Sequence, residues 1–369
     1  MRLHGSLVKI VPFGISAFLA GIGIAMIRPA LTYYSRYELY ASATQVSSLT
    51  TGFMIARALV APTIGYLGDV YVKVRGYAVK YGLLGAVLVS LAYYYTSSFM
   101  VLMALYSLHG FIYGIVWPTV QTLVGTIASP KDKGKCMTLY FTFGGLGLSL
   151  GYKIYGTLNI PDKMLFILGT FSYIIASIAL SLTTNYGLKV NDLRFNVKSE
   201  FRFRGMIAGR GTLWILLVSL MSGYILGLMY EFLFLYLREV HDVGKELLGN
   251  MLLTASIIGT FLNIPIGFIA DKYSIKHVLV WIITLAIIGS LILSLRLNVY
   301  FVILAVVLLV VSGRVILPLT RSLASLLYRY SNRFCKHLFK RWIFNFTYNI
   351  RGETLNCSVL YGSVSLCFK

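Results

Sequence analysis

Charged side chains are scarce in this sequence. Aspartate, glutamate, lysine and arginine make up 12% of the 369 residues, and only 12 residues are acidic. A soluble protein of this length carries about twice that charged fraction. The scarcity of charge, together with a mean hydropathy of +0.78, excludes an ordinary soluble domain and predicts an integral membrane protein.

The residues of common catalytic and metal sites are equally sparse. The only cysteines are Cys136, Cys335, Cys357 and Cys367, and their spacing fits neither a zinc site nor a disulfide framework. The sequence contains no nucleotide-binding loop, metal cluster or catalytic triad, and its polar segments are too short for an ATPase domain. We therefore expect neither an enzyme nor a bound cofactor.

Positive charge is the exception to this scarcity. The net charge of +21 is typical of nucleic-acid-binding proteins, but here the lysines and arginines lie in short segments between apolar runs. In membrane proteins such residues set the orientation of the spans. We therefore expect the lipid bilayer, and not a nucleic acid, as the partner of the basic residues.

Ten apolar segments are each long enough to cross a hydrocarbon core of about 30 Å as a helix of about 20 residues. The strands of an outer-membrane barrel are shorter. The sequence therefore predicts an all-α polytopic membrane protein, and the first segment lacks a signal-peptide cleavage site. The predicted spans lie near 10–33, 46–67, 77–96, 99–127, 137–158, 163–184, 212–236, 247–270, 277–296 and 299–326.

Basic residues are concentrated on one side of these spans. That side includes Lys9, Lys73, Lys131 and Lys272, whereas lysines and arginines on the other side are partly balanced by acids such as Glu239. Since lysine and arginine accumulate in cytoplasmic loops, we expect a cytoplasmic amino terminus in a multi-pass protein of the cell membrane.

One loop pattern occurs twice, with Asp69 and Asp271 lying 202 residues apart. Further pairs recur at nearly the same offset. They are Tyr34 with Tyr236, Arg36 with Arg238, and Trp117-Pro118 with Leu317-Pro318. Repeats at one offset predict two similar halves.

The repeated loops resemble the signature of the major facilitator superfamily, between its second and third and its eighth and ninth helices. The residues that carry this resemblance are Gly65, Asp69, Lys73, Arg75, Gly267, Asp271 and Lys272. The match is incomplete, because Val70, Val72 and Ser274 stand where the family prefers a basic residue or glycine. The resemblance implies two six-helix halves that rock about a central site.

Two further helices depart from common family patterns. Tyr106 stands where an arginine is frequent, and Tyr152 follows Gly151 where antiporter members often have a proline. The second departure weakens a drug–proton antiporter interpretation. Glycines in the same predicted helix predict close helix packing. They are Gly144, Gly145, Gly147 and Gly151.

The expected organisation is an amino-terminal six-helix bundle (1–184), a basic cytoplasmic linker (185–211), a carboxy-terminal bundle of about four helices (212–328) and an atypical basic tail (329–369). The linker either lies along the anionic inner leaflet or is disordered without a role. The second half is thus incomplete. Either a truncated or frameshifted end or a genuine amphipathic tail explains the change of composition.

Ionisable residues within the predicted spans are costly and few, and Lys153 is one of them. The candidates for the substrate or proton pathway are Arg28, Arg57, His109, Glu231 and Arg314, with Gln121 as a polar neighbour of the bend at Pro118. Glu231 is the only acid among them. His109 is either titratable near neutral pH or a hydrogen-bonded packing residue. For Arg57, the alternative is a pair with its own loop or with a carbonyl of the 99–127 helix.

Arg28 and Glu231 carry the sharpest expectation. The resemblance implies that their helices line the central cavity and meet at its outer mouth. A pair there could form a gate, bind an anionic group or carry a proton; alternatively, Arg28 snorkels outward and Glu231 meets water.

We therefore expect a monomeric secondary transporter of a small solute that works by alternating access and is driven by protons through Glu231. The alternative is a uniporter, which is not driven by protons. The rival from another class is a non-transporting membrane sensor or an inactive remnant that lacks its last two helices.

Overall fold

The protein is described here by a computed structural model that covers residues 3–127, 133–183, 210–273, 275–295, 297–316 and 319–320. Within these ranges the regular secondary structure is entirely helical. The all-α prediction is therefore confirmed. The predicted tail and the predicted linker, apart from residues 210 and 211, lie outside the described residues.

The first half contains six long helices. They are α1 (Leu3–Tyr33) with its short π-helical end η1 (Tyr34–Glu38), α2 (Ala43–Val70), α3 (Val72–Tyr95), α4 (Phe99–Ile127), α5 (Lys133–Thr157) and α6 (Asp162–Thr183). Their order matches the six predicted spans of this half.

The second half begins with a helix in three pieces, α8 (Arg210–Gly227), η3 (Leu228–Phe232) and α9 (Leu233–His241). It continues with α10 (Lys245–Tyr273), α11 (Ile275–Ser294) and a helix at Val299–Ile316. In the described part of the chain, eight helical segments are long and apolar enough to cross a membrane. With α2 and α5, they account for the ten predicted spans, so the polytopic fold is confirmed.

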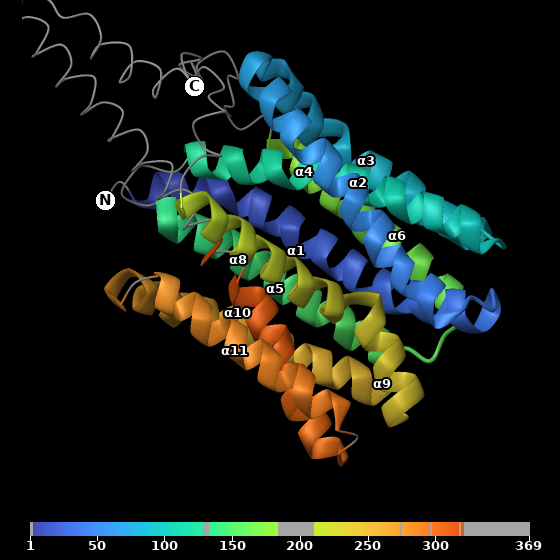
Figure 1. Cartoon of the computed structure of the whole chain (residues 1–369). Helices are drawn as coiled ribbons and strands as arrows, with labels where there is room; N and C mark the ends of the chain where they lie inside the picture. Colours follow the sequence, from blue (N-terminus) through green and yellow to red (C-terminus); the bar gives the residue numbers. More distant parts are fainter. Residues whose placement is uncertain are drawn as a thin grey trace, which may run out of the picture.

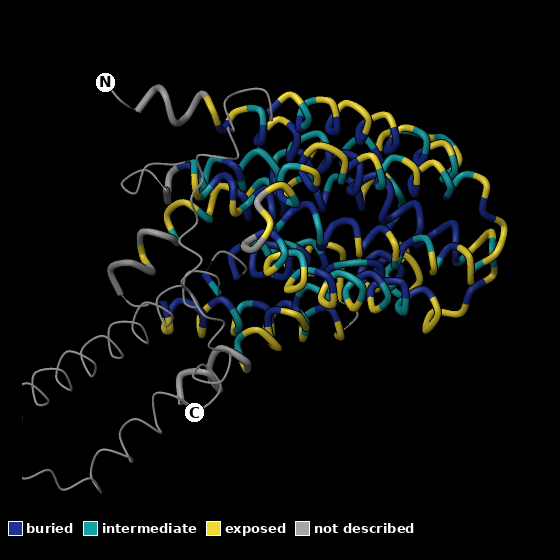
Figure 2. Tube along the Cα trace, turned by 90° about the horizontal axis from the view of Figure 1, so that it is seen from above, coloured by how far each residue is buried: buried dark blue, intermediate teal, exposed yellow. Residues whose placement is uncertain are grey.

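Helix α1 lies at the centre of the first half, where it packs against α5 and α6 (Figure 1). Helix α2 packs against α4, and α10 of the second half packs along α5. Buried residues face the inside of the bundle, while many outward-facing residues are exposed (Figure 2). Several of these exposed residues are large and apolar, such as Leu59 and Trp281, as expected for a surface in contact with lipid.

The predicted duplication is visible in the backbone at one end of the molecule. Tyr40 and Asp242, 202 positions apart, are the two non-glycine residues with positive φ, at 54° and 49°, among the described residues. The residue after each of them donates its N–H to a carbonyl six residues back: Ala41 to Ser35 and Val243 to Leu237. The two connections thus have the same geometry.

The repeated tyrosines also play the same part in the two halves. The Tyr34 hydroxyl donates to the carbonyl of Thr96 at the end of α3, and the Tyr236 hydroxyl donates to that of Leu293 at the end of α11. Each ties the first helix of its half to the end of the third. Local geometry therefore confirms the repeat that the sequence offset predicted.

Close packing of α5 on α1 is confirmed. A Cβ atom added to Gly147 would lie 2.0 Å from the carbonyl oxygen of Phe18, and one added to Gly151 would lie 2.5 Å from that of Ile22. Both α1 carbonyls therefore occupy space that any larger residue would need.

The first signature loop differs from the prediction in two ways. Helices α2 and α3 are separated by Tyr71 alone, so the expected basic loop is largely helical. Gly65 has no atom of the described residues within 4 Å of an added Cβ, whereas the buried Arg75 side chain packs on Gly68, which differs from the expected loop position of this arginine. Lys73 is exposed. The side chains of Asp69, Gly267, Asp271 and Lys272 lie outside the described set.

Candidate functional site

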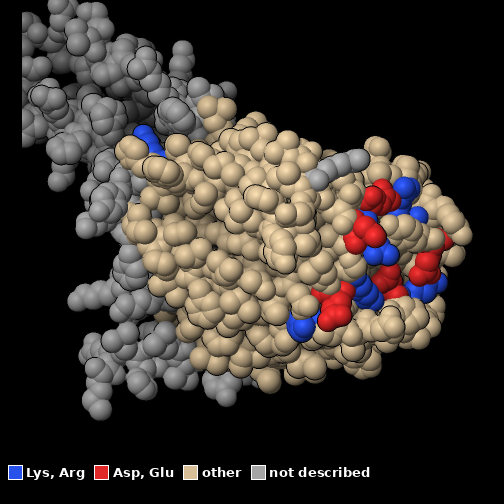
Figure 3. All heavy atoms as spheres, turned by 90° about the horizontal axis from the view of Figure 1, so that it is seen from below, with Lys and Arg blue, Asp and Glu red and all other residues tan. Residues whose placement is uncertain are grey.

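Charged side chains gather at one end of the molecule, next to η1 and α9 (Figure 3). We call it the charged end and define it by Arg36, Asp162, Glu239 and Lys245. Arg36 Nε donates to Glu239 Oε1 at 2.5 Å, and Lys245 Nζ lies 3.8 Å from Asp162 Oδ1. Both ion pairs connect the first half to the second, so the halves are joined at this end.

Glu231 lies at a break in the helix that the sequence predicts as one span. Tyr230, just before it, has φ −95° and ψ −134°, which interrupts the helix between α8 and α9. Glu231 is fully buried, and its two carboxylate oxygens accept hydrogen bonds from the hydroxyls of Thr50 and Tyr106. Since Thr50 is in α2 and Tyr106 in α4, these bonds join an acid of the second half to the first half.

Arg28 lies among the aromatic rings that surround Glu231. It is 5% exposed, and its guanidinium carbon is 3.8 Å from the centre of the Tyr230 ring and 5.3 Å from that of Phe53. The Phe53 ring in turn packs on Tyr106, with the ring centres 4.9 Å apart. Arg28 is therefore linked to Glu231 through aromatic rings.

The structure brings Arg28 and Glu231 into one buried cluster, although they form no direct ion pair among the described residues. The alternative in which Arg28 snorkels outward and Glu231 meets water is wrong, because both side chains are buried. The 202-residue offset makes Tyr230 the counterpart of Arg28. Equivalent positions of the two halves thus lie against each other.

His109 belongs to the first half alone. Its Nδ1 is 2.9 Å from the Tyr93 hydroxyl, and the side chain is fully buried among the rings of Tyr113 and Tyr173. This environment matches the packing alternative for His109. Its Nε2 has no partner among the described residues.

The remaining predicted residues are dispersed. Arg314 Nη2 donates to Ser256 Oγ at 3.2 Å, within the second half. Lys153 donates to Asn250 Oδ1 at 2.6 Å and so joins α5 to α10. Arg57 and Gln121 are half-buried, and among the described contacts neither makes a side-chain hydrogen bond.

Four residues of the cluster are not predicted as site residues, namely Thr50, Phe53, Tyr106 and Tyr230. For Tyr106 the sequence holds a signal, because it departs from the family at a position where arginine is frequent. For Tyr230 the signal is its offset from Arg28. Thr50 and Phe53 carry no such mark, since residues of these types are common throughout the spans.

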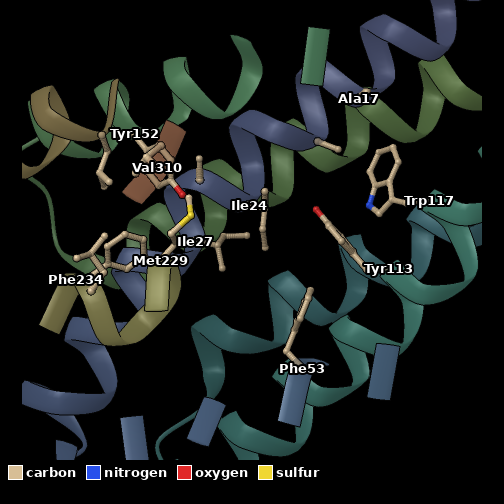
Figure 4. Close-up of a cluster of buried hydrophobic side chains, with 14 of the residues drawn as sticks. Ala17, Ile24, Ile27, Phe53, Tyr113, Trp117, Tyr152, Met229, Phe234 and Val310 are labelled. Atoms are coloured by element: carbon tan, nitrogen blue, oxygen red, sulfur yellow. The ribbon is translucent and has the colours of Figure 1, made fainter. Parts of the chain in front are cut away.

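Apolar and aromatic side chains from both halves surround this place. Figure 4 shows Tyr152 of α5 and Ile27 of α1 close to Met229 and Phe234 of the second half. The rings of Tyr152 and Phe234 lie 6.1 Å apart in an edge-to-face arrangement. The polar cluster therefore lies in a largely apolar contact between the halves, where hydrogen bonds are strong and unpaired charges are costly.

This arrangement links one buried carboxylate to the contact between the halves. Glu231 of the second half accepts hydrogen bonds from two hydroxyls of the first half. A chemical change at this carboxylate therefore changes a contact between the halves.

Comparison with solved structures reveals related folds. A bacterial homologue of the human lysosomal transporter Spinster, in an inward-facing, unoccupied conformation, matches with a TM-score of 0.66 at 14% identity over 86% of this chain and 74% of that one. The nucleoside transporter NupG matches with a TM-score of 0.63 at 12% identity over 87% and 82% of the two chains.

The human organic anion transporter MFSD10 matches with a TM-score of 0.55 at 14% identity over 87% of this chain and 85% of that one. At such identities the similarity shows the fold. Among curated proteins, none matches the chain. The family model of the Major Facilitator Superfamily matches residues 13–333. A match to this family indicates a membrane transporter rather than an enzyme. The chain belongs to the Major Facilitator Superfamily.

Proposed function

We propose that this protein is a secondary transporter that moves a small solute by alternating access and uses Glu231 to couple the movement to protons. The observation that carries the proposal is the position of Glu231. A buried carboxylate of one half is held by two hydroxyls of the other half. In a rocking mechanism these bonds must break and re-form in every cycle.

The charged end supports the same mechanism. Its two ion pairs join the halves in the described conformation and are the contacts that must open in the opposite one. By the distribution of basic residues, we place the charged end on the outer side and the amino terminus in the cytoplasm, in a monomer of the cell membrane.

The class of solute can be tested with the purified full-length protein in liposomes. We suggest uptake assays with nucleosides and organic anions, since these are the solutes of two structural neighbours. An imposed proton gradient and a pH-sensitive dye inside the liposomes would report coupling. Solute uptake accompanied by proton movement supports the proposal. Uptake without any proton movement would contradict the coupling, and no uptake of any solute would favour a sensor or an inactive remnant.

A further inference from the structure

Away from their ends, the described spans hold more positive than negative charge. Arg28, Arg57, Lys153 and Arg314 lie there, whereas Glu231 is the one described acid that is not at a span end. A buried charge is costly unless it is paired. Glu231 carries at most one negative charge, so this acid cannot balance all four cations.

Arg28 keeps a donor available. Its guanidinium carbon lies over the rings of Phe53 and Tyr230, while its buried Nε has no hydrogen-bond partner among the described residues. A nitrogen of this kind is expensive to bury without an acceptor. The rings occupy the space above the guanidinium group, so an acceptor would approach its edge.

Arg314 approaches the same region from the second half. It follows Gly313, where an added Cβ would lie 2.0 Å from Met229 Sδ. Met229 in turn precedes the Tyr230 that covers Arg28.

The hydrogen bond of Arg314 goes to a neutral hydroxyl, Ser256 Oγ, at 3.2 Å, so no carboxylate balances its charge among the described contacts. The side chain packs on Gly259, where an added Cβ would lie 3.0 Å from Arg314 Cγ. Gly259 thus makes the room in which this arginine lies against α10.

Two further polar groups lie at the contact between the halves. Tyr152 of α5 is buried, and its ring lies 6.1 Å from that of Phe234 in the second half. Thr260, beside Gly145 at the contact of α10 with α5, has a buried hydroxyl oxygen with no partner among the described residues. Arg28 in the first half and Thr260 in the second thus each keep an unpartnered polar atom at this contact.

We infer that Arg28 and Arg314 together bind the carboxylate of a small organic anion between the two halves. The planar guanidinium group offers paired N–H donors that match the two oxygens of a carboxylate. The bound anion supplies the negative charge that the described spans lack. This inference rests on the proposed function, because it identifies the transported solute as an anion.

Binding by the purified full-length protein tests this inference without any transport. The probes are monocarboxylates, dicarboxylates and aromatic carboxylates, each compared with its neutral amide, and the readout is the shift of the thermal unfolding midpoint with probe concentration. We expect at least one carboxylate to stabilise the protein while its amide does not. Equal stabilisation by the amide, or none by any carboxylate, would overturn the inference.

Substitutions then locate the site. Arg314→Gln and Arg28→Gln should each weaken carboxylate binding about ten- to hundredfold, as expected for the loss of a charged hydrogen-bond donor. Arg314→Lys keeps the charge but loses the paired donors, so this variant should bind the carboxylate with intermediate affinity. It also provides a test of this position if the glutamine variant does not fold. Arg238→Gln, at the charged end, is the control and should bind like the parent protein. Unchanged binding in both Arg314 variants would refute the assignment.

The two proposals fail in different ways. Carboxylate binding that depends on the arginines, without uptake into liposomes, would refute the transport proposal and leave this site in place. Uptake of neutral solutes by a protein that binds no carboxylate would overturn the site and leave the transport proposal in place.

Discussion

At the scale of single residues, the account depends on Arg28, Glu231 and the aromatic rings between them. The sequence identifies the two charged residues because ionisable groups are costly in a membrane span and so stand out. It does not identify Thr50 and Tyr106 as partners of Glu231, which lies 181 and 125 positions from them along the chain. Hydroxyl residues are common in membrane helices, and only the packing of the halves selects these two.

Arg28 and Glu231 should be energetically coupled. Arg28→Ala leaves Glu231 without a neighbouring cation, and Glu231→Gln leaves Arg28 without a neighbouring anion, so each single change should destabilise the protein. The double variant should lose less than the sum, with an interaction energy of about 0.5–3 kcal/mol. Unfolding free energies of the four proteins measure this quantity. Strictly additive losses would show that the aromatic rings isolate the two charges from each other.

At the scale of the helices, the apolar segments predict the spans well and their breaks poorly. The number and order of the spans follow from hydropathy because each must cover the hydrocarbon core. The interruption at Tyr230 and the π-helical end at Tyr34–Glu38 do not follow, because the flanking residues remain apolar. The sequence predicts a longer connection between α2 and α3 than the structure has. Lys73 and Arg75 are polar and therefore suggest a loop, but both belong to α3.

Two glycines of α5 provide a matched test of helix packing. Gly147→Ala would place a Cβ 2.0 Å from the Phe18 carbonyl oxygen, whereas the atom nearest to an added Cβ at Gly144 is 3.8 Å away. We expect Gly147→Ala to destabilise the protein by about 1–3 kcal/mol, because α1 must move. Gly144→Ala should be neutral or slightly stabilising. Thermal unfolding of both variants checks the order, and equal midpoints would contradict the packing described for α1 and α5.

At the scale of the whole molecule, the two halves share one design and meet at the charged end. The equivalent connections at Tyr40 and Asp242 show that the repeat extends to backbone detail. Sequence offsets predict this similarity, since equal spacing preserves equal geometry. They cannot predict which contacts cross from one half to the other, such as Arg36 with Glu239, because those contacts depend on the conformation of the transporter.

The ion pair between Arg36 and Glu239 should help to hold the charged end together. Arg36→Glu would place two carboxylates opposite each other and should lower the thermal unfolding midpoint. Combining it with Glu239→Arg should restore part of the loss. Restoration should be incomplete, because Arg36 also donates to the Ala41 carbonyl at 2.8 Å. A swapped protein no more stable than the single reversal would rule out a role for the pair.

The uneven distribution of basic residues predicts the orientation of the molecule in the membrane. In a variant with all four native cysteines replaced by serine, a single cysteine at Asp242 should react with a membrane-impermeant reagent applied to intact cells. A cysteine at the exposed Lys73, at the opposite end, should react only after the membrane is opened. The reverse pattern would place the amino terminus outside.

The central claim is that Glu231 couples protons to the movement of the two halves, and solute accumulation in liposomes tests it most directly. With a transported solute and an imposed proton gradient, the parent protein should concentrate the solute inside. Glu231→Gln preserves the size of the side chain but removes its titratable proton, so it should abolish accumulation and retain exchange down a solute gradient. A Glu231→Gln protein that still accumulates solute against its gradient would contradict the account.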